Sequence, residues 1–327
     1  MYVYFYRITT AASATIVYLL YLKNKSDLEN IKFLRYFVIY WLVYLTSTFL
    51  NYPVKLFYVA TVAYSWFGLA LLVAICCKKW VGEFLQAITN LFCIWIYLNF
   101  ILDILYPDGV YRTVNYHTAH LLGDDNAMVF VMLPGVLLSI CNSLYKYGSL
   151  NFNSILLILV CSYSLLSVWA VSAFLSMFLF VCLLIFILRW KYIDPRLMLL
   201  GLVATMIFCI FGLSTPLISS FVENTLEKDM TLTGRTFLWA QAIFEIIQHP
   251  ILGYGGYFQY GSWTIQIGDI VEYPCHTPYL QLLLDGGVIL FSVTIFMIVM
   301  ASEVVRKNKS NIIGIILMAG LGSMLFN

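Results

Sequence analysis

The sequence predicts an all-α protein, a polytopic membrane bundle of about ten transmembrane helices. Hydrophobic residues make up 62% of the 327 residues and charged residues only 10%, whereas a soluble domain carries about 25% charged residues. The mean hydropathy is +0.89. Apolar runs close to twenty residues long recur along the chain, and this is the length that an α-helix needs to cross the hydrocarbon core of a bilayer.

The predicted spans follow one another along the chain. They lie at 3–22, 33–50, 54–75, 84–102, 128–145, 150–168, 170–188, 197–216, 279–302 and 311–327. The apolar stretch over 150–188 has no charged break, and as one helix it would be about 58 Å long at 1.5 Å per residue. Because that is roughly twice the hydrocarbon thickness, we predict two spans with a turn near Ser164 to Ser172.

The basic residues predict the orientation of the chain. An N-terminus on the outer side leaves only five of the 18 basic residues outside: Arg7, Lys55, Arg112, Lys228 and Arg235. Basic residues concentrate in short cytoplasmic loops, so this orientation is favoured. With 150–188 as a single span, the basic residues of 189–196 and 306–309 would lie outside, against the same rule.

Two long outer loops, 103–127 and 217–278, hold the four histidines of the chain: His117, His120, His249 and His276. No internal repeat or low-complexity linker divides the sequence, so we predict a single integral-membrane domain over 1–327. The eight cysteines lack any CxxC spacing and lie almost all in apolar runs, which is typical of packing residues rather than of metal sites or disulfides.

The second outer loop is predicted to contain one short helix between the spans at 197–216 and 279–302. Thr233 can cap a helix that includes Arg235 in its first turn and that runs to about Gln248, before Pro250. The helix is apolar on most faces, so it should pack on the bundle or lie at the membrane interface. Arg235 opposes the helix dipole. A bound phosphate would remove that conflict, and a solvated arginine is the alternative.

The end of this loop carries two candidate functional positions. His276 stands where the chain re-enters the membrane, and a neutral imidazole there can act as a base. Asp285 falls inside the following span, where an acid is costly unless it has a role or a partner. The adjacent Gly286 and Gly287 would allow close packing.

A glycine-rich turn precedes that end of the loop. Gly253, Gly255 and Gly256 follow His249-Pro250. No strand comes before them and no helix follows with the required spacing, so they do not form a dinucleotide-binding fingerprint. His249 is either a structural hydrogen-bonding residue or a catalytic one.

The first outer loop offers a rival constellation. His117, His120, Asp124 and Asp125 have a spacing that could hold a divalent metal. The alternative interpretation is a solvated polar loop that contacts glycan.

The motifs of the second loop together resemble the O-antigen polymerase and O-antigen ligase family of bacterial inner-membrane glycan transferases. The residues that carry the resemblance are Gly234-Arg235 and Trp239, then His249-Pro250, Gly253 and Gly255, then His276, Tyr279-Leu280 and Gly286. They occupy about 55 residues, and the many-span topology with its long late outer loop extends the likeness over most of the chain.

The resemblance implies a glycosyltransferase on the outer face of the bacterial inner membrane, without metal or cofactor. Its donor would be an oligosaccharide on a polyprenyl pyrophosphate, with Arg235 on the pyrophosphate and His276 activating the acceptor hydroxyl. Implied substrate-binding residues are Arg112, Trp239, His249, Gly253, Gly255 and Tyr279. Implied partners are membrane lipid, a chain-length regulator and a flippase, and no nucleic acid.

The chain departs from the family pattern in two places. The family usually reads His-Asn at the loop end, where this chain has His276-Thr277, and many members carry a Ser-Arg pair in a middle span, where this chain has Ser167-Val168. A second phosphate-binding arginine therefore has to come from elsewhere, with Arg112 as the candidate, or is absent.

Four functions remain open at this stage. The leading one is a polysaccharide repeat-unit polymerase, because an enzyme outside the cytoplasm needs a preactivated lipid donor whose pyrophosphate leaving group arginine can stabilise. The ligase of the same family is the close alternative. A metal-dependent glycosyltransferase with a lipid-phosphate-sugar donor could use Asp124 and Asp125. A transporter or flippase is expected to have charged or broken spans, whereas these spans are nearly free of charge.

Overall fold

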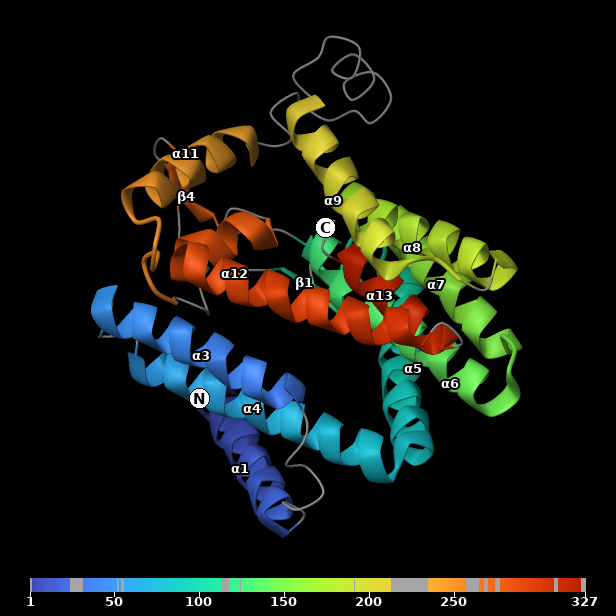
Figure 1. Ribbon diagram of the computed structural model, residues 1–327. Helices are drawn as coiled ribbons and strands as arrows, with labels where there is room; N and C mark the ends of the chain where they lie inside the picture. Colours follow the sequence, from blue (N-terminus) through green and yellow to red (C-terminus); the bar gives the residue numbers. More distant parts are fainter. Residues whose placement is uncertain are drawn as a thin grey trace. The chain divides into compact units, whose positions relative to one another are not determined.

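The structure is a computed structural model (Figure 1) that describes residues 2–23, 32–51, 53, 56–112, 118–123, 125–190, 192–212, 235–256, 265–267, 270–273, 277–308 and 311–324. Its helices are α1 (Tyr2–Lys23), α3 (Lys32–Asn51), α4 (Leu56–Lys79), α5 (Val81–Leu105), α6 (Val129–Tyr147), α7 (Phe152–Ser167), α8 (Val171–Trp190), α9 (Pro195–Gly212), α11 (Arg235–Gln248), α12 (Pro278–Lys307) and α13 (Ile312–Met324). Two short antiparallel pairs join β1 (Tyr111–Arg112) to β2 (Thr118–Ala119) and β3 (Ile265–Ile267) to β4 (Ile270–Tyr273).

The predicted all-α membrane class is confirmed, and each predicted span has a helix at its place. Six helical segments in the described part of the chain are long and apolar enough to cross a membrane: Phe33–Asn51, Leu56–Lys79, Val81–Leu105, Asn126–Tyr147, Val171–Trp190 and Pro278–Lys307. The apolar segments Thr10–Lys23, Phe152–Ser167 and Ile312–Met324 are shorter. The chain is therefore a multi-pass membrane protein, and the count of ten spans stays a prediction.

The stretch over 150–188 contains two helices, as its length predicted. The side chain of Asn151 accepts a hydrogen bond from the Ser154 amide and so caps the start of α7. The chain turns within three residues between α7 and α8, where Trp169 has a positive φ of 53°. The Ala170 amide donates to the Leu165 carbonyl across this turn, at 3.0 Å.

The chain divides into two compact units. Unit 1 comprises Met1–Lys79 and Gly212–Met300, and unit 2 comprises Trp80–Phe211 and Ala301–Asn327. In unit 1, α4 packs against both α1 and α3. Gly68 permits the first of these contacts, because a Cβ there would lie 2.8 Å from the Cβ of Ala14. The single domain predicted over 1–327 stays a prediction.

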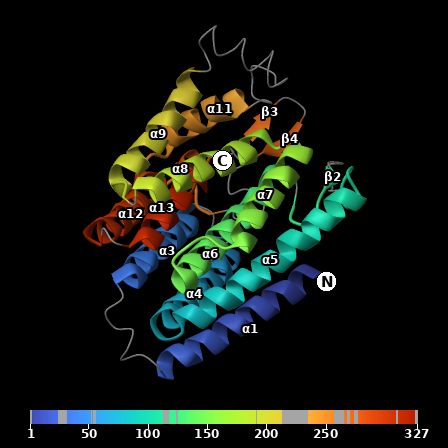
Figure 2. The same ribbon diagram turned by 90° about the vertical axis from the view of Figure 1, so that its right-hand side faces the viewer.

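Unit 2 is a helical bundle around α6. The helices α5, α7 and α8 all contact α6, and α13 contacts α6 and α8 (Figure 2). Residues such as Met132, Leu133 and Ile140 on α6 are fully buried. Gly135 lies against Ile96 of α5, and a Cβ at this glycine would meet the Phe92 side chain at 3.2 Å. The small residue thus sets how closely the two helices approach.

Candidate functional site

The short helix predicted in the second outer loop is α11. It spans Arg235–Gln248, and its end at Gln248 agrees with the prediction, whereas the predicted cap Thr233 lies outside the described residues. Ala242 is fully buried and forms a small apolar cluster with Leu284 of α12, against which Ile246, Tyr254 and Leu280 pack. This helix therefore packs on the beginning of α12 within unit 1.

The glycine-rich turn leaves α11 without an intervening linker. The His249 amide donates to the Glu245 carbonyl at 3.2 Å, and the Gly253 amide donates to the His249 carbonyl at 3.1 Å. The exposed His249 ring packs on the ring of Tyr254, with centroids 4.4 Å apart. The Tyr254 hydroxyl donates to the Glu245 carboxylate at 2.7 Å. The His249 ring thus takes part in the packing of the folded turn, and the substrate-binding role of His249 stays a prediction.

Tyr254 keeps its proton in this arrangement. Burial and the hydrogen bond to the Glu245 carboxylate raise the pKa of Tyr254 to about 12. The neutral hydroxyl remains a donor at physiological pH, and it ties the turn to the last turns of α11.

The helix α12 is broken at Gly287, where φ is 62° and ψ is −163°. The break leaves backbone groups on both sides without the partners of a continuous helix, and the 249–256 loop supplies them. The amides of Tyr254 and Gly255 donate to the carbonyls of Leu284 and Asp285, at 2.7 and 3.0 Å. The loop is therefore inserted into the hydrogen-bond ladder of α12.

The backbone amides that follow the break also find hydrogen-bond acceptors in the 249–256 loop. The amide of Val288 donates to the Pro250 carbonyl at 2.8 Å, and that of Ile289 donates to the Ile251 carbonyl at 3.4 Å. In an unbroken helix these two amides would bond to residues 284 and 285. The loop thus replaces two consecutive helical hydrogen bonds with four bonds of its own.

Glycines make this insertion possible. A Cβ on Gly253 would lie under 3.0 Å from the Leu284 carbonyl oxygen, and a Cβ on Gly287 would lie equally close to the Ile251 carbonyl. Gly255 approaches the backbone of Thr48 on α3, and it has a φ of 91°. The close packing predicted at Gly287 is confirmed. Close packing against α12 and α3 explains why positions 253 and 255 are glycines. The substrate-binding role of Gly253 and Gly255 stays a prediction.

The remaining predicted site residues fall around this arrangement. Trp239 lies on α11 and Tyr279 on the first turn of α12, and both are half-buried. Arg235 is the first residue of α11, but its side chain lies outside the described residues, as does His276. Arg112 belongs to β1 in unit 2, and its side chain is likewise outside the described part.

Sequence reasoning missed the contribution of α3. Thr48 accepts a hydrogen bond from the Gly256 amide at 2.8 Å. Tyr44 and Ser47 also contact the loop and the break in α12. The available signal was a group of hydroxyl side chains in an otherwise apolar span, but nothing in the sequence pairs that span with residues more than 200 positions later.

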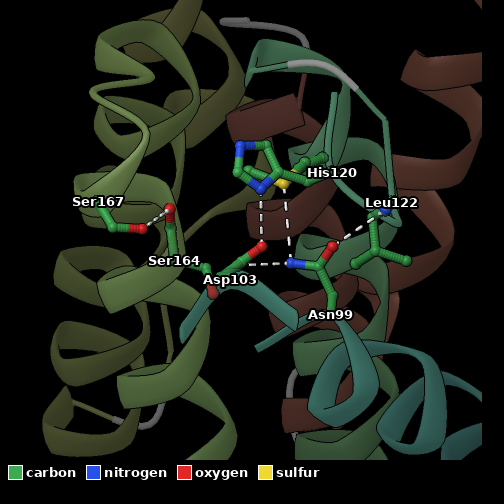
Figure 3. Close-up of polar contacts among 7 residues, drawn as sticks. Asn99, Asp103, His120, Leu122, Ser164 and Ser167 are labelled. Carbon is green, nitrogen blue, oxygen red and sulfur yellow. Dashed lines mark hydrogen bonds and ion pairs between the residues drawn. The ribbon is translucent and has the colours of Figure 1, made fainter. Parts of the chain in front are cut away.

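The first outer loop contains a buried histidine, His120, and is therefore not fully solvated. The helix α5 extends to Leu105, so Asp103 lies in its last turn rather than in the loop. His120 is only 2% exposed, and its Nδ1 lies 2.8 Å from Oδ1 of Asp103 (Figure 3). Asn99 donates to the other carboxylate oxygen at 2.7 Å and accepts from the Leu122 amide at 3.0 Å. For His120, the solvated interpretation is wrong, because a buried carboxylate holds it.

The Asp103–His120 contact limits the divalent-metal site that the first outer loop was predicted to offer as an alternative. The Nδ1 of His120 is engaged by Asp103, and only its second ring nitrogen could serve as a ligand. Within the described residues, no group of three or more His, Cys, Asp or Glu side chains could hold a metal ion. His117, Asp124 and the side chain of Asp125 lie outside the described residues.

We expect the Asp103–His120 pair to anchor the first outer loop. Replacing His120 with alanine removes a hydrogen-bond partner of the buried Asp103 carboxyl group, and a buried polar group that loses its partner costs about 1–3 kcal/mol. Thermal unfolding of purified protein in detergent should show a midpoint lowered by several degrees. His249→Ala is the matched comparison, and its midpoint should fall less, since that ring is exposed and packs on Tyr254 at the surface. Equal midpoints for the two variants would contradict the anchoring role.

The comparisons with known proteins agree with the motif resemblance. The family model described as O-antigen ligase matches residues 150–295, a little under half of the chain. This segment includes α11, the 249–256 loop and the break in α12.

No curated protein and no solved structure matches the chain. The family match therefore carries the assignment by itself, and its position coincides with the motifs that suggested the resemblance. Over residues 150–295, this multi-pass membrane protein is similar to the O-antigen ligase family.

Proposed function

We propose that this protein is a polysaccharide repeat-unit polymerase of the bacterial inner membrane. It transfers a glycan from one polyprenyl pyrophosphate carrier to a sugar hydroxyl of the repeat unit on another carrier, on the outer face of the membrane. The observation that carries this proposal is the O-antigen ligase match over 150–295, which covers the inserted loop and the helices on either side of it.

The proposed reaction gives different tasks to two residues of the second outer loop, Arg235 and His276. Arg235 binds the donor pyrophosphate and holds it more tightly as negative charge develops on the leaving group. His276 takes the proton from the attacking hydroxyl, and its imidazole suits that task near neutral pH. The hydroxyl oxygen forms a bond to the anomeric carbon while the bond to pyrophosphate breaks. A single displacement of this kind inverts the anomeric carbon and needs no metal.

The ligase reaction is the second candidate, and the description of the matching family favours it. A ligase uses the same lipid-linked donor and differs in its acceptor, which is a completed lipid-linked core sugar. A transporter is less well supported. The broken α12 and its buried acid resemble features of transporter sites, but here the chain's own loop fills the break.

The deciding experiment supplies purified protein with synthetic polyprenyl-pyrophosphate-linked repeat units, with and without a lipid-linked core acceptor. We expect a ladder of lengthening lipid-linked glycans without the core acceptor, and the same ladder in the presence of EDTA. Asp124→Ala combined with Asp125→Ala should lose less than tenfold in rate, about 1.4 kcal/mol of barrier. One transfer to the core acceptor, without a ladder, would make the protein a ligase. Loss of activity in EDTA would support the metal-dependent alternative.

A further inference from the structure

Asp285 is a buried acid that the proposed chemistry does not use. Its side chain is almost fully enclosed, with 4% of the residue exposed. Tyr44 of α3 donates to Oδ2 at 2.9 Å, and Gln281 of α12 donates to Oδ1 at 2.9 Å. The Asp285 carbonyl accepts from the Ser47 hydroxyl at 2.8 Å and from the Gly255 amide at 3.0 Å. One residue thus joins α3, α12 and the 249–256 loop.

Further contacts from α3 complete this junction, which we call the latch: Tyr44, Ser47 and Thr48 with Asp285 and the 249–256 loop. The Ser47 hydroxyl also contacts the Leu252 carbonyl. The Thr48 hydroxyl donates to the Tyr44 carbonyl and accepts from the Gly256 amide, both at 2.8 Å. The Tyr44 ring fills the space beside Gly256, where a Cβ would lie under 3.0 Å from it. All of these residues belong to unit 1.

Two helices end at the latch. The helix α11 stops at Gln248, directly before the loop, and the first part of α12 stops at the break beside Asp285. They pack against each other through Ala242 and Leu284. Because their C-terminal ends meet and their sides are in contact, both helices run toward the latch from their first residues, as Figure 1 shows for α11 and the start of α12.

The first residues of α11 and α12 are next to the two predicted catalytic residues in the sequence, or are one of them. Arg235 opens α11, and Pro278 opens α12 two positions after His276 in the sequence. At 1.5 Å per residue the two helical segments extend about 20 Å and about 13 Å from the latch. A rotation of about 5° at the latch would therefore displace the start of α11 by nearly 2 Å, and a displacement of about 1 Å can cost 10²-fold in rate.

We propose that Asp285, together with Tyr44 and Ser47, is a positioning site for the transfer reaction. It locks the loop into the break of α12 and so sets the separation between the beginnings of α11 and α12. The expected effect on the rate of transfer rests on the proposed function. The contacts of the latch can be tested without an activity assay.

Hydrogen exchange measured by mass spectrometry tests the latch on the full-length protein in detergent. In Ser47→Ala, the amides of Tyr254 and Gly255 should exchange at least about tenfold faster, because the Ser47 hydroxyl no longer holds the Leu252 carbonyl of the loop or the Asp285 carbonyl, which is the acceptor of the Gly255 amide. Ser65→Ala is the matched control, since the Ser65 hydroxyl donates to the Thr61 carbonyl of its own helix. Unchanged exchange in Ser47→Ala would overturn the proposal.

Single-turnover kinetics test the positioning role. Tyr44→Phe keeps the ring beside Gly256 but removes the donor to Asp285, so we expect the rate of transfer to fall about 10- to 100-fold while KM changes less than threefold. Asp285→Asn combined with Tyr44→Phe should be no slower than the slower single variant, because Asp285→Asn weakens the same Tyr44–Asp285 contact that Tyr44→Phe removes. Tyr64→Phe is the control, since that hydroxyl bonds to Thr15 in the same unit.

The outcomes separate the two proposals. An altered exchange pattern with an unaltered rate of transfer would overturn the positioning role. A wild-type protein that transfers glycan to neither acceptor would overturn the proposed function, and the exchange data would still show whether the latch holds the loop. If Tyr44→Phe does not yield folded protein, Ser47→Ala serves for the kinetic measurement as well.

Discussion

Replacing His276 with alanine should nearly abolish glycan transfer while the protein still reaches the membrane in normal amount. Removing a positioned general base costs about 10²–10⁴-fold in rate. The expected loss is in the chemical step, since the acceptor hydroxyl would no longer have a partner to take its proton. The measurement is a single-turnover assay with purified protein and lipid-linked repeat units, so that binding and chain release do not limit the rate.

Two further variants sharpen this test. Arg235→Lys should also transfer poorly, because an ammonium lacks the planar fork with which a guanidinium grips two phosphate oxygens. His249→Ala should have a milder effect, because the His249 ring packs on Tyr254 at the surface of the turn. Transfer by His276→Ala at a near wild-type rate would show that the base lies elsewhere, and the first outer loop would be the next place to look.

Replacing Gly287 with alanine should prevent the break in α12 from accommodating the loop. The backbone at Gly287 has φ 62° and ψ −163°, a region that is almost restricted to glycine. An added Cβ would also meet the Ile251 carbonyl at a distance that real side chains do not tolerate. Strain of about 1–3 kcal/mol from the backbone alone, added to the clash, should leave little correctly folded protein.

Gly148 provides a control that isolates the effect of close approach. It also has a positive φ, of 68°, but nothing lies within 4 Å of a Cβ added there. Gly148→Ala should therefore cost only the backbone term, about 1 kcal/mol, and should give a monodisperse protein in size-exclusion chromatography with a slightly lowered unfolding midpoint. If Gly287→Ala behaves like Gly148→Ala in both measurements, the loop is not inserted into α12.

Local features of the sequence predicted most of the helical architecture. The length of each apolar run and the spacing of breaks between runs are properties of neighbouring residues, and the bilayer thickness turns them into helices. The turn at 168–170 lies within the predicted region near Ser164 to Ser172, which followed from the length of the apolar stretch and from the positions of the basic residues. The end of α11 at Gln248 followed from the proline at position 250.

The family was also accessible from the sequence, because its motifs are short and lie within about 55 residues of each other. The family match over 150–295 agrees with them. The glycines of the 249–256 turn could be recognised as a turn. The sequence could not show why these positions require glycine, because the requirement comes from the backbone of α12 and α3 that lies against them.

The sequence by itself determined that this chain crosses the membrane repeatedly, where its apolar helices lie along the chain, and which stretch carries the family motifs. Only the tertiary structure decided that α12 is broken at Gly287 and filled by the 249–256 loop, that Tyr44 and Gln281 hold Asp285, and that His120 is buried on Asp103. Helix formation and capping depend on residues within one or two turns. The partners Tyr44 and Asp285 stand 241 positions apart, so only the path of the folded chain brings them together.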